Sequence, residues 1–276
     1  MIAWHELIGR LPFEWAHYAF MRNALLAVLL LAPLYAALGG MVVNRRMAFF
    51  SEAIGHSALT GVAIGTLAGL ADPLGAMLPF AALLAGGISW IRRHSSVPSD
   101  SVIGLVMAFT MSLGVVILSR GGSFARYAAY LVGDILTLAP RDLALLAALL
   151  PAVGILWAGW YNRFLLAGLN PPLAVSRGLR VGALDTAFSV VVALVVTLSI
   201  RWVGLLVVNA LLILPAAAAR NLARRASAYL VWALAISAAS GVLGLVTSYY
   251  ANTAAGATIV LFAMAFFALT LAARRP

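Results

Sequence analysis

The 276-residue sequence predicts an all-α integral membrane protein, a polytopic bundle of about nine transmembrane helices within a range of eight to ten. Hydrophobic residues make up 64% of the chain and charged residues 9%, and the mean hydropathy is +1.05. A soluble domain is much less apolar. The apolar residues form continuous runs, not the alternating pattern of outer-membrane strands, which favours helices over a barrel. With no linker in view, we expect one transmembrane domain over residues 1–276.

The first twenty residues are predicted to form an interfacial amphipathic helix. They are rich in aromatic side chains of the types that anchor at the headgroup level: Trp4, Phe13, Trp15, Tyr18 and Phe20. They are also too aromatic and too charged for a secretory signal peptide.

Nine apolar runs follow, each near the length needed to cross about 30 Å of hydrocarbon. The predicted spans are residues 24–43, 48–71, 73–91, 101–119, 143–161, 184–200, 202–219, 227–248 and 255–272. Residues 127–140 contain Asp134 and Pro140 and are predicted to form a short or re-entrant helix instead.

All eighteen basic residues are arginine, and they lie mainly between the apolar runs. Alternating the sides of nine spans places twelve arginines on one face and six on the other. The positive-inside rule makes the first face cytoplasmic, with the C-terminus inside and the N-terminus outside. The formal charge of +10 therefore sets the topology and does not indicate nucleic-acid binding.

Several classes of chemistry are excluded by what the sequence lacks. Without cysteine, no thiolate metal site or disulfide is possible. Without lysine, the chain cannot carry a P-loop, so any ATP hydrolysis by that machinery belongs to another subunit. No metalloprotease motif, aspartate-rich diphosphate motif or serine nucleophile elbow occurs, so we expect no enzyme.

Two ionisable residues stand out within the second predicted span. Glu52, His56 and Thr60 repeat at four-residue spacing and share one face of a helix. An ionisable group at bilayer depth costs about 2.5 to 3.5 kcal/mol, so such groups tend to mark transport pathways. Gly61 and Gly65 follow with the small-residue spacing that lets a neighbouring helix approach closely.

Three interpretations of Glu52 and His56 stay open. The pair can simply satisfy each other and fix the helix register; it can relay protons; or it can bind a metal, since carboxylate and imidazole ligate both zinc and manganese. Two ligands are too few for a metal site. Other helices must contribute, or a twofold partner must donate a second Glu52 and His56.

Weaker candidates lie elsewhere. Asp134 is either a second pathway residue or a helix cap at the re-entrant turn, and Asn209 is a polar residue within a span that more often bridges helices. Residues 162–183 form the longest predicted cytoplasmic connection. They are either a tether on the membrane surface or a docking element for a soluble partner.

The segment RRMAFFSEAIGHSALTGVAIG, from Arg45 to Gly65, resembles the second-helix signature of the membrane subunits of zinc and manganese ABC importers. The likeness continues, in order, through YLVGDILTLAPRDL, GLLVVNALLILPAAAAR and SGVLGLVTSYYANTAAGATIVL, ending at Leu261. Glu52 stands where that family usually has Asp, and Asn209 where a serine is common. The longer carboxylate of Glu52 shifts the ligand by one methylene.

This resemblance implies a permease of the type II-like importer fold in a bacterial inner membrane. It implies a homodimer, two copies of a cytoplasmic ATPase and an extracytoplasmic solute-binding protein. Zinc, or else manganese, would be the transported ion, with no permanently bound cofactor, and Glu52 and His56 would line its pathway. Thr60, Asp134 and Asn209 are secondary polar candidates. The ATPase-docking element would fall on Pro172, Ala174, Arg177, Gly178 and Leu179.

Two other functions remain open. A secondary carrier would use Glu52 and His56 as a proton relay and would stop when the proton gradient collapses. A structural scaffold would tolerate Glu52→Gln and His56→Ala with no change in metal accumulation.

Overall fold

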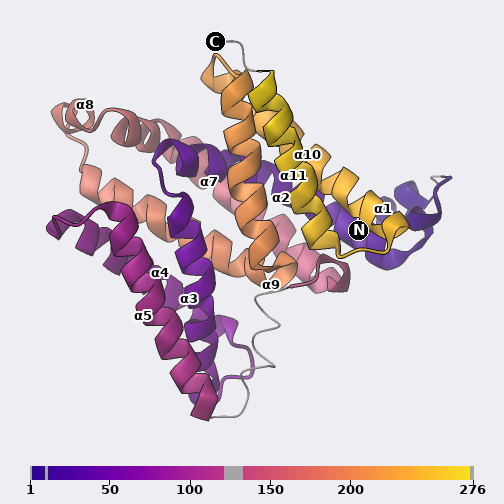
Figure 1. The fold of residues 1–276 in the computed structure, drawn as a ribbon, viewed down its shortest axis with the longest axis horizontal. Helices are drawn as coiled ribbons and strands as arrows, with labels where there is room; N and C mark the ends of the chain where they lie inside the picture. The colour runs from indigo at the N-terminus through magenta and orange to yellow at the C-terminus, as the bar shows by residue number, and fades with distance from the viewer. Residues whose placement is uncertain (1, 10–11, 121–132, 274–276) are drawn as a thin grey trace. The chain divides into compact units, whose positions relative to one another are not determined.

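The computed structural model describes residues 2–9, 12–120 and 133–273, and these residues form helices and no strand (Figure 1). Seven helices are long and apolar enough to cross a membrane: α2 (Ala19–Asn44), α4 (Leu74–His94), α5 (Ser99–Arg120), α7 (Pro140–Leu169), α9 (Val181–Leu222), α10 (Ala226–Ala251) and α11 (Ala255–Ala272). The helix α3 (Ala48–Leu67) has the length but carries Glu52 and His56. The prediction of an all-α, multi-span membrane protein is therefore confirmed.

The chain divides into two compact units. The first comprises Met1–Val43, Asp134–Ala158 and Ala210–Pro276, and the second comprises Asn44–Gly133 and Gly159–Asn209. Two helices, α7 and α9, contribute residues to both units.

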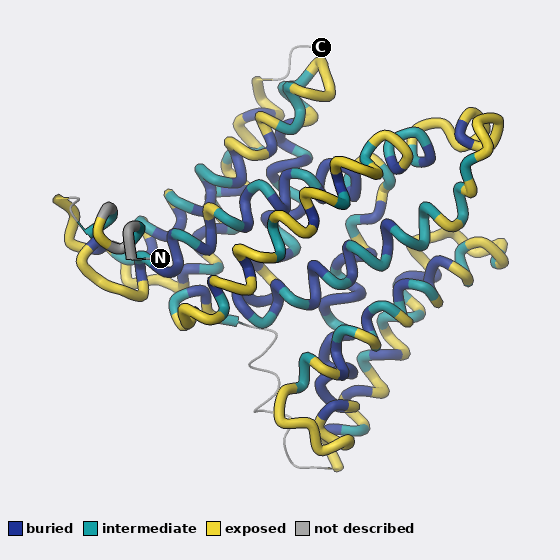
Figure 2. The backbone as a smooth tube through the Cα atoms, turned by 180° about the vertical axis from the view of Figure 1, so that it is seen from behind, coloured by how far each residue is buried: buried dark blue, intermediate teal, exposed yellow. Residues whose placement is uncertain are grey.

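In the first unit, α2 is the central helix. Most of its residues are buried, whereas α11 buries only five (Figure 2). Glycines bring the helices close: a Cβ on Gly39 would meet the Leu212 carbonyl, and one on Gly241 would meet Val28. The exposed apolar side chains of α11 are suited to lipid, because a bilayer imposes no cost on them.

In the second unit, α3 packs against both α4 and α5. Its Gly61 lies against the backbone of Met77 in α4, and Gly114 of α5 lies against the backbone of Thr60. Because helices without side chains at the contact can approach to backbone distance, these glycines hold α3 between its two neighbours.

Residues 1–20, predicted to form one interfacial amphipathic helix, do not form a single helix in the described structure. The structure has instead α1 (Ile2–Gly9) and a 3-10 helix, η1 (Glu14–His17). Pro12 precedes η1, and proline removes a backbone donor and resists helix continuation. Trp15, one of the predicted anchors, is buried at 7% exposure, whereas Phe13 and Tyr18 are exposed.

The two predicted spans at 184–200 and 202–219 appear as one 42-residue element, α9, interrupted at Gly204. Gly204 has φ 80° and ψ 160°, which only glycine adopts readily. The break therefore falls three residues after the predicted boundary at Arg201. Gly133, also at positive φ, lies against the Gly204 backbone so closely that a Cβ would clash.

Residues 127–132 of the predicted re-entrant segment, 127–140, lie outside the described residues. Its end forms a short 3-10 helix, η2 (Ile135–Thr137), before α7 begins at Pro140.

Candidate metal centre

The turn between α2 and α3 sets where the candidate ligands begin. Arg46 adopts a left-handed conformation with φ 56°, Met47 is the N-cap, and α3 starts at Ala48. Glu52 and His56 then lie one turn apart on the same face. The Glu52 and His56 side chains are 46% and 31% exposed, so other helices of the same chain do not fully cover this face of α3.

Glu52 Oε1 and His56 Nε2 are 4.0 Å apart, which is too long for a hydrogen bond. The other ring nitrogen of His56, Nδ1, is buried and has no hydrogen-bond partner among the described residues. A ring nitrogen in this position normally finds a partner. Glu52 and His56 therefore do not satisfy each other by a hydrogen bond.

Within the described part of one protomer, no group of three or more histidine, aspartate or glutamate side chains converges. Zinc sites in proteins normally have at least three protein ligands. Glu52 and His56 of one chain are therefore fewer than the ligands that such a zinc site needs.

Thr60 differs from the two residues that precede it on the same stripe. It is fully buried, and its hydroxyl donates a hydrogen bond to the backbone carbonyl of Thr110 in α5. One turn earlier, the hydroxyls of Ser57 and Thr110 lie 2.5 Å apart. The stripe on α3 is therefore open at Glu52 and His56 but occupied by α5 at Thr60.

The spacing of Gly61 and Gly65 predicts that another helix packs closely against this side of α3. In the structure, that helix is α4. A Cβ on Gly61 would be 2.8 Å from the Met77 Cα, and one on Gly65 would be 3.2 Å from the Ala76 Cβ.

Asp134 is the N-cap of η2. Its carboxylate accepts a hydrogen bond of 2.9 Å from the Leu136 amide, which is the capping alternative of the sequence analysis. Asn209 follows the α9 break, and its Oδ1 is buried without a partner among the described residues.

The predicted 162–183 loop is largely helical, which corrects that expectation. Residues 162–169 continue α7, because Phe164 and Ala167 pack inward at helical spacing and are buried. Asn170 then caps a six-residue helix, α8 (Pro171–Ser176), through a 3.1 Å bond from the Leu173 amide.

The predicted docking residues lie on α8 and just after it. Ala174 is buried, whereas Pro172 and Arg177 are exposed. The helix ends at Ser176, Gly178 follows two residues later with φ 73°, and the amide of Leu179 donates to the Ala174 carbonyl. This is a typical glycine C-cap, which gives the exposed helix a fixed shape.

Arg45, just before α3, has contacts that the sequence did not predict; the sequence indicated only a role in membrane topology for it. The Arg45 side chain is 7% exposed. Its Nη1 donates to Asp185 of α9 at 2.5 Å, and its Nη2 donates to the Phe164 carbonyl of α7 at 2.5 Å. Burial lowers the pKa of Arg45, and the charge of Asp185 opposes that shift. The acidic Asp185 at the start of an apolar run was the available signal.

A second arginine–aspartate pair lies elsewhere in the second unit. Arg201 Nη1 donates to both carboxylate oxygens of Asp72, at 3.0 and 2.8 Å. The Arg201 and Asp72 side chains are 33% and 54% exposed, against 7% and 43% for Arg45 and Asp185, so the two pairs differ mainly in the burial of the arginine.

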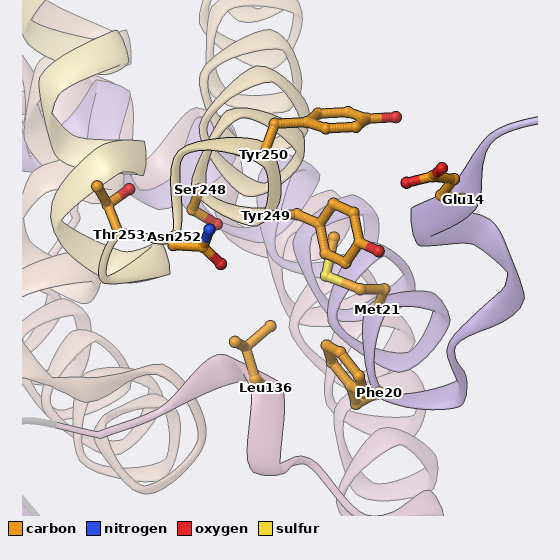
Figure 3. Close-up of a pocket in the computed structure, with 9 residues that line it drawn as sticks. All are labelled: Glu14, Phe20, Met21, Leu136, Ser248, Tyr249, Tyr250, Asn252 and Thr253. Carbon is orange, nitrogen blue, oxygen red and sulfur yellow. The ribbon is translucent and has the colours of Figure 1, made fainter.

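The first unit contains a cavity of about 600 Å³ where the beginning of α2 meets the end of α10 (Figure 3). Its wall includes three aromatic rings and one carboxylate, and none of the predicted site residues lines it. Figure 3 shows the rings of Phe20 and Tyr249 beside Met21, with Glu14 at the rim.

Comparison with known proteins gives a consistent picture. The model of the ABC 3 transport family matches residues 17–274. The manganese transport system membrane protein MntC of Listeria monocytogenes is 31% identical, over 91% of this chain and 89% of its own length. The high-affinity zinc uptake system membrane protein ZnuB of Haemophilus influenzae is also 31% identical, over 90% of this chain and 95% of its own.

A solved structure resembles the whole fold. PsaBC from Streptococcus pneumoniae in complex with Fab superposes with a TM-score of 0.80 at 28% identity, covering 98% of this chain and 95% of the other. A putative metal-chelate type ABC transporter in an inward-facing conformation has a TM-score of 0.68 at 13% identity, which supports the fold alone.

Proposed function

The chain belongs to the ABC 3 transport family, and we propose that it is the membrane subunit of an ATP-driven importer of a divalent transition metal. It is a multi-pass protein of a bacterial inner membrane. The observation that carries the proposal is the open pair on α3, Glu52 and His56, with an unpartnered imidazole nitrogen. The relatives named for manganese and for zinc support the metal class.

The complete metal centre forms between two copies of the chain. One protomer supplies one carboxylate and one imidazole, and a homodimer doubles this to two of each. Four such ligands can form the tetrahedral set that zinc prefers, whereas manganese favours more oxygen ligands. Zinc is therefore the proposed ion, and manganese is the alternative. The ion is cargo, so the centre must bind it weakly enough for release. Asn209 is a secondary polar group along the same route.

Energy for transport comes from a separate protein. The chain has no lysine and hence no P-loop, so a cytoplasmic ATPase must bind to it, one copy per protomer. The exposed helix α8, followed by Gly178, is the proposed docking element, and the arginine bias supports a cytoplasmic location for it. A solute-binding protein delivers the metal to the opposite face.

The test is metal uptake by proteoliposomes that contain this chain with its ATPase and binding protein. We expect ATP-dependent uptake of zinc, faster than that of manganese, and a loss of uptake in both Glu52→Gln and His56→Ala. Glu6→Gln and His94→Ala are matched controls, because both residues are exposed and lie outside the α3 stripe. Equal rates for the two metals would refute the zinc preference, and no uptake of either would refute the function.

A proton-coupled secondary carrier is the competing function, because Glu52 and His56 can also relay protons. Uptake that stops when the proton gradient is collapsed, with ATP still present, would favour this carrier. Uptake that continues under those conditions and stops on ATP depletion supports the ATP-driven importer.

A further inference from the structure

We propose that Arg45 is a positioning residue that couples the docking helix α8 to the metal-binding helix α3. This inference rests on the proposed function and deepens it. Arg45 immediately precedes the left-handed residue Arg46, and Glu52 lies about 6 Å along α3 from its first residue, Ala48. Any displacement of Arg45 is therefore passed directly to the candidate ligands.

Arg45 holds the two helices that flank α8. One amino group donates to the Phe164 carbonyl near the end of α7, and the other donates to Asp185 near the start of α9. In the chain, α8 lies between α7 and α9. The single guanidinium therefore joins both helices that flank the docking helix to the beginning of α3.

The surroundings of Arg45 make this connection stiff. The guanidinium carbon lies 4.7 Å from the centre of the Phe188 ring, and Phe188 packs edge-on against Phe164 at 5.7 Å. Both phenylalanines are fully buried. Gly168 of α7 admits the arginine, since a Cβ there would be 2.9 Å from its Nε. A planar guanidinium fixed on several sides transmits a displacement better than a flexible surface pair.

The second unit offers a matched control. The Arg201–Asp72 pair has the same chemistry but is more exposed, and it joins α9, twenty residues after that helix begins, to the connection between α3 and α4. If the Arg45–Asp185 pair only stabilised the fold, breaking either pair should have the same effect on the amount of zinc transported per ATP hydrolysed.

The experiment measures zinc transported per ATP hydrolysed in proteoliposomes of the full complex. Asp185→Asn keeps the size of the side chain and removes its charge. We expect ATP hydrolysis to persist while zinc per ATP falls about 10-fold, the size of a typical coupling between sites. Asp185→Glu should restore the ratio, and Asp72→Asn should leave it unchanged. An unchanged ratio in Asp185→Asn, or a parallel loss of hydrolysis and uptake, would overturn the inference.

A second measurement does not depend on transport. The chain has no cysteine, so Phe49→Cys in α3 and Leu169→Cys in α7, both exposed positions, can carry a pair of spin labels. We expect their distance distribution to stay narrow in all nucleotide states of the parent complex and to broaden in Asp185→Asn. Identical distributions would refute the coupling role, whereas a parent complex that moves no metal would refute the proposed function instead.

Discussion

The two ends of α3 are held in place by different kinds of interaction. At its start, the buried guanidinium of Arg45 bonds to α7 and α9. At its far end, Gly61 and Gly65 let α4 approach to backbone distance, and the only charged pair nearby in the described chain is the exposed Asp72–Arg201 pair. The buried guanidinium joins the start of α3 to two helices at once, whereas the glycine contacts hold its far end against α4 alone. The comparison teaches that a displacement of α7 and α9 can be passed to the first end of α3, while the second end stays packed against its neighbour.

The largest effect is expected at the buried charge. Arg45→Met should lower the free energy of unfolding by about 3 kcal/mol, because it removes the two hydrogen bonds that the buried guanidinium donates to Asp185 and to the Phe164 carbonyl. Unfolding in mixed micelles, followed by tryptophan fluorescence, measures it. Arg46→Met is the control, since Arg46 is exposed and carries the same charge. Equal losses in the two variants would show that burial of Arg45 contributes nothing.

Next in size is Gly61→Ala. The new Cβ would lie 2.8 Å from the Met77 Cα, so α4 must move away, at a cost of about 1 to 3 kcal/mol. Gly104→Ala in α5 is the control because its Cβ meets nothing within 4 Å. Helix propensity should make that variant more stable by up to about 1 kcal/mol. The same unfolding assay decides, and a harmless Gly61→Ala would contradict tight packing at this end.

A smaller loss is expected from Thr60→Val, which removes the hydroxyl that bonds to α5. Hydrogen bonds between transmembrane helices average about 0.6 kcal/mol. Thr66→Val is the control, because the Thr66 hydroxyl bonds only to the Val62 carbonyl of its own helix in the described structure. If Thr60→Val instead abolished zinc uptake while unfolding stayed normal, Thr60 would be a pathway residue.

The smallest effect is expected at the exposed pair. Asp72→Asn should cost under about 1 kcal/mol, and the difference should shrink in about 1 M salt, because exposed ion pairs are screened. The cost of Arg45→Met should keep its size in the same salt series. A salt-independent loss at Asp72 would remove the contrast between the two ends of α3.

Local sequence patterns anticipated much of this architecture. The apolar runs located the long helices, and the small-residue spacing at Gly61 indicated a helix neighbour. Prediction was wrong where polar residues continue a helix: Asn162 and Arg163 suggested a loop, but the inward-facing Phe164 extends α7. The signal for that extension was the helical spacing of Phe164 and Ala167.

The contacts of Arg45 could not be predicted in the same way. Arg45 and Asp185 are 140 residues apart, and nothing in either local segment specifies the other as its partner. Glu52 and His56 could be identified as candidates because ionisable residues within an apolar run are visible in the local sequence. The residues that surround them could not be predicted, because they depend on how helices distant in the sequence pack.

The break in α9 has a consequence for how the topology is measured. Forty-two helical residues would extend about 63 Å, twice the hydrocarbon thickness, so the element is long enough for two crossings joined at Gly204. Such a junction has a single non-helical residue and leaves very little chain between the two crossings. A protease or an antibody would have no loop there to cleave or to bind. Mapping by loop accessibility would therefore count one crossing too few and assign the C-terminus to the wrong side.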